Sequence, residues 1–204
     1  MRKSTSFRRF GRWLISFNLV SLALFGKVVN AGDERVVVHD TERYPYNHIV
    51  MVGYDGDKDG DLGAYGSGAL VGPHMILTAG HVVYSRSKGH YNKSDIYIVP
   101  GAYRGTSSSG AVETSSSVDV EAPYGFRMAS RLRTNTKWQD ASYSPKGDVD
   151  YGAIFVDCPF WDLTIYMPLG FDYEPSYLQM SGYPVEDLSD NSHLFDQWFG
   201  GGER

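Results

Sequence analysis

Two residues of this sequence, His81 and Asp150, have types and positions that suit proton transfer. His81 closes the segment Thr-Ala-Gly-His at residues 78–81, directly after the apolar residues 75–77. A tight turn there would hold the imidazole in a defined direction. A general base needs this, because its heavy atom must come within about 2.6–3.2 Å of the atom that gives up the proton.

The aspartate has a matching place. Asp150 opens the segment Asp-Tyr-Gly-Ala-Ile at residues 150–154 and precedes the apolar residues 154–156. A carboxylate at the mouth of a strand can accept the imidazole N–H, which fixes the tautomer and stabilises the imidazolium formed during catalysis. The pattern therefore predicts His81 as a general base and Asp150 as the residue that orients it.

Short apolar stretches separated by turn residues must position this pair. They lie at residues 36–38, 49–52, 69–71, 75–77, 96–99 and 154–156. Such spacing is typical of an all-β barrel or sandwich. Residues 79–84 form a helical turn at most, because they lack the length and periodicity of a full helix. A rise in aromatic, proline and glycine content predicts a subdomain boundary near residues 158–165.

Composition limits the class of protein. The 204 residues are 42% hydrophobic and 21% charged, which is enough for a sizeable core and excludes disorder, collagen and a coiled coil. The single cysteine, Cys158, excludes an intrachain disulfide, a cysteine-based zinc cage and an iron–sulfur cluster. Because it ends the strand that follows Asp150, Cys158 is predicted to be a packed free thiol rather than a nucleophile.

The N-terminal residues 1–31 have the pattern of a secretory signal peptide. Basic residues precede an apolar run at 13–25, and Val-Asn-Ala at 29–31 suits a signal peptidase. The rival reading is a transmembrane anchor, but polar residues interrupt the run and it is shorter than the ~20 residues of a span. Cleavage after Ala31 removes six basic and no acidic residues, and the remaining 13 basic and 24 acidic residues give a net charge of −11.

These features predict a secreted protein with no stable membrane association after cleavage. An acidic surface repels phosphate backbones, so nucleic acid is excluded as a partner. Export with one cysteine favours a bacterial source, since small extracellular animal domains usually carry disulfides.

The blocks around His81 and Asp150 resemble the histidine and aspartate motifs of trypsin-like serine endopeptidases, in the bacterial glutamyl-endopeptidase (V8-like) branch. Residues 33–46, Pro100-Gly101 with 123–125, and Ser-Gly-Tyr-Pro at 181–184 resemble further stretches of that family in the same order. The resemblance implies an all-β, chymotrypsin-like double β-barrel. The N-terminal β-barrel at 33–157 would be complete and carry both residues, and 158–204 would be the start of an incomplete, truncated C-terminal β-barrel.

The resemblance also implies the chemistry. A monomeric enzyme of this family hydrolyses peptide bonds of protein or peptide substrates by a Ser-His-Asp triad, without a cofactor, and a preference for Glu or Asp would be carried over from the branch. The nucleophile of the family lies in a Gly-x-Ser-Gly motif beyond Ser-Gly-Tyr-Pro, and these 204 residues contain no such motif.

Other serines do not replace it in the sequence pattern. Ser67 lies between glycines in an expected strand and has a structural role on the family pattern, while Ser109 and Ser192 lie in polar loops. The sequence therefore predicts no nucleophile serine in this chain, and a truncated or inactive form of the endopeptidase. A second hypothesis is a non-catalytic secreted binding protein derived from a protease barrel.

A metal site is not predicted. Residues 55–61 alternate oxygen ligands as a calcium loop does, but the twelfth position is Gly66 where a glutamate is required. A solvated loop is the preferred reading, and a weak calcium site stays open. The other histidines, which are His39, His48, His74, His90 and His193, lack the His-Glu-x-x-His spacing of a metalloprotease.

Overall fold

The computed structural model describes residues 36–55, 63–105, 120–140, 142–143, 147–170, 177–184 and 197–203. The predicted signal peptide, Ser109, Ser192, His193 and most of the calcium-like loop lie outside these residues. What is described consists of strands and very short helical turns, so the all-β prediction is confirmed.

The strands are β1 (Val36–Val37), β2 (Ile49–Tyr54), β3 (Gly63–Gly72), β4 (Met75–Thr78), β5 (Tyr84–Ser85), β6 (Gly89–His90), β7 (Ile96–Pro100), β8 (Tyr103–Arg104), β9 (Val120–Glu121), β10 (Arg127–Met128), β11 (Arg131–Thr134), β12 (Gly152–Phe155), β13 (Tyr177–Gly182) and β14 (Trp198–Glu203). The helical turns are η1 (Tyr46–His48), α1 (Gly80–Val83), η2 (Lys93–Asp95), α2 (Thr136–Gln139) and η3 (Gly147–Val149).

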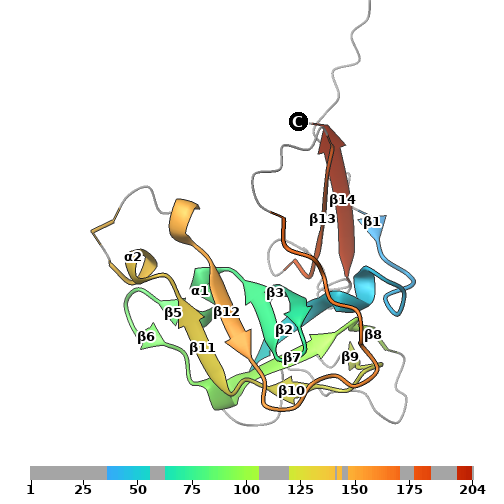
Figure 1. The fold of residues 1–204 in the computed structure, drawn as a ribbon, viewed down its shortest axis with the longest axis horizontal. Helices are drawn as coiled ribbons and strands as arrows, with labels where there is room; N and C mark the ends of the chain where they lie inside the picture. The colour runs from blue at the N-terminus through green and yellow to red at the C-terminus, as the bar shows by residue number, and fades with distance from the viewer. Residues whose placement is uncertain are drawn as a thin grey trace, which may run out of the picture. The chain divides into compact units, whose positions relative to one another are not determined.

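Seven strands form the main sheet, in the order β10-β7-β2-β3-β4-β12-β11, and all neighbours whose register is known run antiparallel. The sheet curls rather than lying flat (Figure 1). The larger core cluster includes residues of three of its strands, Leu70, Ile76 and Ile154, all with no exposed surface.

Strand β2, which lies between β7 and β3, is buried on both faces. Val50 and Val52 belong to the larger core cluster, whereas Ile49 and Met51 belong to a second cluster that also contains Tyr183. Side chains alternate between the two faces of a strand, so β2 serves both clusters at once. This explains why its sequence is an unbroken apolar run instead of an alternating one.

The pairing of β4 with β12 determines where the site lies. The two strands are antiparallel, with Ile76 opposite Ile154 and Thr78 opposite Gly152. The chain leaves β4 after Thr78 and enters β12 at Gly152, so the C-terminal end of β4 and the N-terminal end of β12 lie side by side. His81 follows the end of β4 by three residues and Asp150 precedes the start of β12 by two.

A second sheet has the order β1-β14-β13. The Ser67 hydroxyl of β3 ties it to the main sheet, because it accepts from the Tyr183 backbone N–H at 2.7 Å and lies 3.2 Å from the Tyr183 carbonyl oxygen. The Tyr183 hydroxyl donates to the Ala102 carbonyl at 2.9 Å. Burial raises the pKa of Tyr183 well above its usual value. Ser67 thus has the structural role expected of it.

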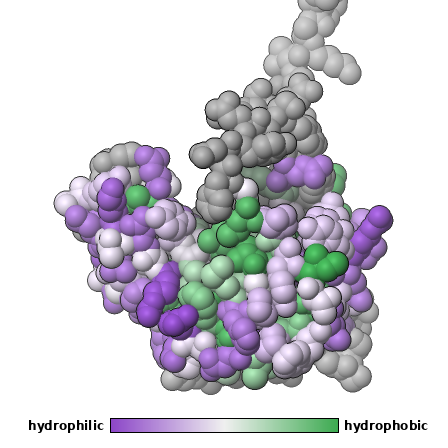
Figure 2. All heavy atoms as spheres, viewed as in Figure 1, coloured by the Kyte–Doolittle hydropathy of each residue, from purple (hydrophilic) through white to green (hydrophobic). Residues whose placement is uncertain are grey.

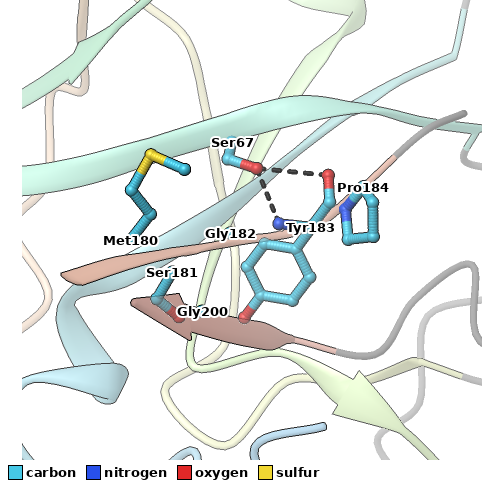
Figure 3. Close-up of a pocket in the computed structure, with 7 residues that line it drawn as sticks. All are labelled: Ser67, Met180, Ser181, Gly182, Tyr183, Pro184 and Gly200. Atoms are coloured by element: carbon cyan, nitrogen blue, oxygen red, sulfur yellow. Dashed lines mark hydrogen bonds between the residues drawn. The ribbon is translucent and has the colours of Figure 1, made fainter. Parts of the chain in front are cut away.

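A cavity of about 290 Å³ lies at this junction, lined by Ser67, Met180, Ser181, Gly182, Tyr183, Pro184 and Gly200. Figure 3 shows the hydrogen bonds of Ser67 to Tyr183 on one side of it. The Ser67 oxygen is engaged by the backbone of Tyr183, which is a structural use of the side chain.

Cys158 is a free thiol, as predicted, but the prediction that it is packed is wrong, because the residue is exposed. Strand β12 ends at Phe155, and Asp157 and Cys158 bend outward before Phe160 returns to the core. The apolar run that precedes Cys158 therefore does not continue through it as a strand.

Polar and apolar residues share the surface. In Figure 2, apolar residues gather toward the middle of the face shown, while polar residues dominate its margins. The described residues contain no helix with the length and apolar character needed to cross a membrane.

Candidate active site

His81 and Asp150 come together beside the C-terminal end of β4 and the N-terminal end of β12. The imidazole Nδ1 of His81 lies 2.8 Å from Asp150 Oδ2, and the backbone N–H of His81 donates to Asp150 Oδ1 at 2.8 Å. Both carboxylate oxygens of Asp150 thus contact His81. Because a carboxylate can only accept, Nδ1 carries the proton and Nε2 of the neutral ring is left as an acceptor.

The exposure of the two side chains fits this arrangement. The His81 side chain is 61% exposed and that of Asp150 is 23% exposed. The carboxylate is therefore partly enclosed behind the imidazole, while the ring itself faces solvent. A group approaching from outside would meet the histidine first.

Local structure explains how the two residues reach these positions. The chain leaves β4 in an extended conformation at Ala79, and α1 begins at Gly80, so His81 lies in the first turn of α1. On the other side, the turn η3 ends at Val149, directly before Asp150. The predicted helical turn within residues 79–84 is confirmed, as α1.

Gly80 is required by close packing. A Cβ built on this residue would lie 2.8 Å from Thr134 Oγ1, 3.0 Å from Asp150 Oδ1 and 3.1 Å from Trp138 Cδ1. Its backbone does not have a positive φ, in contrast to Gly89, Gly101 and Gly125. The sequence pattern assigned this glycine to a tight turn, but the structure shows that its missing side chain makes room for the aspartate.

We expect Gly80→Ala to lower the free energy of unfolding by about 1–3 kcal/mol, because an added methyl group in a packed site forces its neighbours to shift. It should also lengthen the bond between the His81 N–H and Asp150. Urea denaturation measures the first effect. Gly170→Ala is the control, because a Cβ there meets nothing within 4 Å. Equal stability of the two variants would contradict this prediction.

The residues after Asp150 are held by the end of β11. The Thr134 hydroxyl donates to the Tyr151 carbonyl at 2.8 Å, and the Asn135 side-chain amide bonds to the Tyr151 hydroxyl. These contacts fix the backbone on the C-terminal side of Asp150. The aspartate is therefore anchored at both its side chain and its main chain.

The structure places near His81 residues that no sequence motif marks. Trp138 of α2 has only 8% exposure, and its ring centroid is 6.4 Å from that of His81. The Arg86 guanidinium lies 4.9 Å from the Trp138 ring centroid. Hydrogen bonds from Ser142 hold the pKa of the nearby Asp140 below its usual value, and the charge of Arg86 acts in the same direction. No motif marks these residues, since α2 is a single turn inside a polar segment.

The other candidate residues lie elsewhere. Ser67 is in β3 and bonds Tyr183, and the exposed His74 bonds the Val156 carbonyl through Nδ1 at 3.0 Å. His48 is buried between the rings of Tyr44 and Tyr166, and burial lowers its pKa.

Metal ligands do not gather in the part of the chain that is described. There, no group of three or more His, Cys, Asp or Glu side chains could hold a metal ion. Of the calcium-like loop at residues 55–61, only Asp55 is described, and it is buried.

No family model matches. A glutamyl endopeptidase of Bacillus licheniformis is 30% identical over 163 residues, which are 78% of this chain and 42% of that protein. The chain thus spans less than half the length of the curated relative it matches.

Solved structures share the fold. A Glu endopeptidase has a TM-score of 0.62 at 22% identity, covering 85% of this chain and 69% of its own. The protease Anisep of Arthrobacter nicotinovorans has a TM-score of 0.52 at 18% identity, covering 77% of this chain and 64% of its own. A thermostable serine protease of an extremophilic microorganism has a TM-score of 0.53 at 17% identity, covering 77% and 65%.

The predicted chymotrypsin-like fold is confirmed by these structures. The similarity in sequence covers most of the chain. The relative is a glutamyl endopeptidase, the kind of protein whose motifs the segments around His81 and Asp150 resemble. The resemblance to trypsin-like serine endopeptidases of the bacterial glutamyl-endopeptidase (V8-like) branch is thus confirmed in sequence and in fold.

Proposed function

We propose that this chain supplies a general base, His81, and its orienting carboxylate, Asp150, to a secreted serine endopeptidase. One observation carries the proposal, namely the pair of 2.8 Å contacts that both oxygens of Asp150 make with His81. They orient the ring so that Nε2 is free to accept a proton. The proposed substrates are proteins or peptides, as for other members of the family, and the enzyme acts as a monomer.

The proposed reaction is acyl transfer to a serine. His81 Nε2 takes the proton of the serine hydroxyl as its oxygen attacks the scissile carbonyl, and the resulting imidazolium is stabilised by Asp150. The imidazolium then gives that proton to the leaving amine as the peptide bond breaks. Water enters next, loses a proton to His81 and cleaves the acyl-enzyme, and the proton returns to the serine.

The nucleophile is proposed to be a serine outside these 204 residues, because the sequence contains no Gly-x-Ser-Gly motif. Ser67 is a poor substitute, since its hydroxyl is engaged by the Tyr183 backbone. A preference for cleavage after Glu is proposed from the glutamyl endopeptidase relative. Secretion after removal of residues 1–31 is proposed from the sequence pattern.

A serine-directed fluorophosphonate tests the proposal. The coding locus is sequenced beyond codon 204 in all frames, and both the 204-residue chain and the longer product are expressed and treated with the probe. We expect the longer product to be labelled at a serine in a Gly-x-Ser-Gly motif, with labelling lost in its His81→Ala variant. The 204-residue chain should stay unlabelled and should not cleave casein.

Three results would contradict this proposal. Labelling of the 204-residue chain would place the nucleophile inside it. Absence of the motif from the locus, or an unlabelled longer product, would favour the second hypothesis, a non-catalytic secreted protein that uses the barrel surface for binding. The observation that favours this second function is that the 204 residues contain no Gly-x-Ser-Gly motif.

A further inference from the structure

Trp138 and Arg86 form a cluster beside the His81–Asp150 pair that neither motif includes. Arg86 follows α1 and β5, whereas Trp138 is in α2, so the two come from separate parts of the chain. The Arg86 Nε donates to the Trp138 carbonyl at 2.8 Å, and its Nη2 donates to the Asp140 carbonyl. The guanidinium also lies 4.9 Å from the Trp138 ring centroid. One arginine thus holds both the backbone and the ring of α2.

The Trp138 ring is in turn joined to α1, the turn that carries His81. Its indole N–H donates to the carbonyl of Tyr84, the residue after α1, at 3.3 Å. Its Cδ1 would lie 3.1 Å from a Cβ on Gly80, at the beginning of α1. The ring therefore touches both ends of this short turn.

The ring also lies beside the imidazole, at a tilt. The centroids of Trp138 and His81 are 6.4 Å apart, with an angle of 57° between the planes. The His81 side chain is largely exposed, at 61%, while Trp138 is buried at 8%. A rigid indole on one side restricts the rotamers of an exposed ring, which would otherwise turn freely in water.

The two ends of α2 are fixed independently. At its start, the Asn135 side chain accepts from the Lys137 backbone N–H at 2.9 Å, which caps the turn. At its end, Arg86 binds the last carbonyls. A four-residue helix has little stability of its own, so these contacts are what hold Trp138 in place.

We propose that Trp138, clamped by Arg86, is a positioning residue that holds α1 and the His81 imidazole in the orientation in which Nδ1–H reaches Asp150. The inference rests on the proposed role of His81 as general base. It assigns Trp138 no contact with the reacting atoms. Its effect passes through the geometry and lifetime of one hydrogen bond.

Proton NMR of the chain tests this inference without any catalytic assay. The Nδ1–H proton of His81 is assigned by its loss in His81→Gln and Asp150→Asn, and its exchange rate with water is measured. We expect Trp138→Ala to raise that rate about tenfold, and Trp138→Phe, which keeps an aromatic ring, to raise it less than about threefold. Arg86→Ala should raise it by an intermediate factor.

Arg131→Ala is the matched control. The Arg131 guanidinium lies 4.1 Å from the Phe155 ring centroid, at the opposite end of β12 from Asp150. Its removal deletes an equivalent contact between an arginine and a ring and should leave the exchange rate unchanged. Amide spectra of β4 and β12 verify the fold of each variant, and if Trp138→Ala does not fold, Arg86→Ala, at a half-buried position, decides the question.

The outcomes separate this inference from the proposed function. If Trp138→Ala and Arg86→Ala both exchange at the wild-type rate, the positioning role is overturned and the His81–Asp150 pair stands. If the wild-type chain has no proton that Asp150→Asn removes, the hydrogen bond itself is absent, and the general-base proposal and the positioning role both fail.

Discussion

Asp150→Asn is expected to lower kcat of the complete endopeptidase by about 10⁴-fold, the loss seen when the carboxylate of such a triad becomes an amide. The two contacts of Asp150 give the reason. The Asn oxygen would keep the bond to the His81 backbone N–H, which occupies Oδ1 at 2.8 Å. The amide NH₂ would then face Nδ1 and donate to it. Nδ1 would have to be the acceptor, so the imidazole proton would move to Nε2.

An imidazole in that tautomer cannot take the proton of a serine hydroxyl, because Nε2 is already protonated. The measurement is kcat on a peptide substrate for the longer product described above, with active-site concentration set by fluorophosphonate titration. Asp157→Asn is the control, since Asp157 is an exposed carboxylate just past the other end of β12. It should keep full activity.

NMR of the imidazole nitrogens supplies an independent readout. The proton should lie on Nδ1 in the wild type and on Nε2 in Asp150→Asn. A variant that retains kcat within tenfold of the wild type would show that Asp150 does not orient the base. A low kcat with the proton still on Nδ1 would show that the loss has a cause other than the tautomer.

The sequence predicted the position of this pair because local patterns decide it. The apolar residues 75–77 and 154–156 mark strands β4 and β12, and the polar residues beside them mark the ends of those strands. Strands that pair antiparallel bring the C-terminal end of one beside the N-terminal end of the other. The approach of His81 to Asp150 then needs only that β4 and β12 be neighbours, which they are.

The sequence did not predict the cluster around Trp138, because long-range contacts determine it. Arg86 and Trp138 are 52 positions apart, and α2 has no periodicity to reveal it. The error on Cys158 has a similar cause. An apolar run predicts burial while the strand lasts, but where the chain bends out of the sheet depends on the residues that follow, here Phe160 returning to the core.

Gly80 illustrates a third limit. The pattern identified a glycine that matters, but the reason was spatial and lay in Thr134, Asp150 and Trp138. A single sequence shows where a glycine stands, whereas only the fold shows what occupies the space that its side chain would take. The position of this glycine was therefore informative, and the local explanation offered for it was incomplete.

Ile154→Ala is expected to lower the free energy of unfolding by about 2–5 kcal/mol, the cost of removing a large aliphatic side chain from a packed core. Ile154 has no exposed surface and belongs to the larger core cluster. Its register partners are Ile76 on β4 and Leu132 on β11. It therefore joins the three strands whose ends carry the candidate site.

Two matched variants compare the stability contributed by the core with that contributed by the opposite face of the β4–β12 pair. Ile154→Val removes one methyl group and should cost about 0.5–1.5 kcal/mol. Leu77→Ala changes the residue next to Ile76 on β4, whose side chain lies on the opposite face and is 38% exposed. It should cost about 1 kcal/mol or less, because much of that side chain already contacts water.

Urea denaturation at constant slope measures all three variants. If Ile154→Ala proved no more destabilising than Leu77→Ala, the interior of the curled sheet would not be the main source of stability. The aspartate is four residues before Ile154 and two before the start of β12, so a core that holds β12 against β4 also holds Asp150 within hydrogen-bond distance of His81.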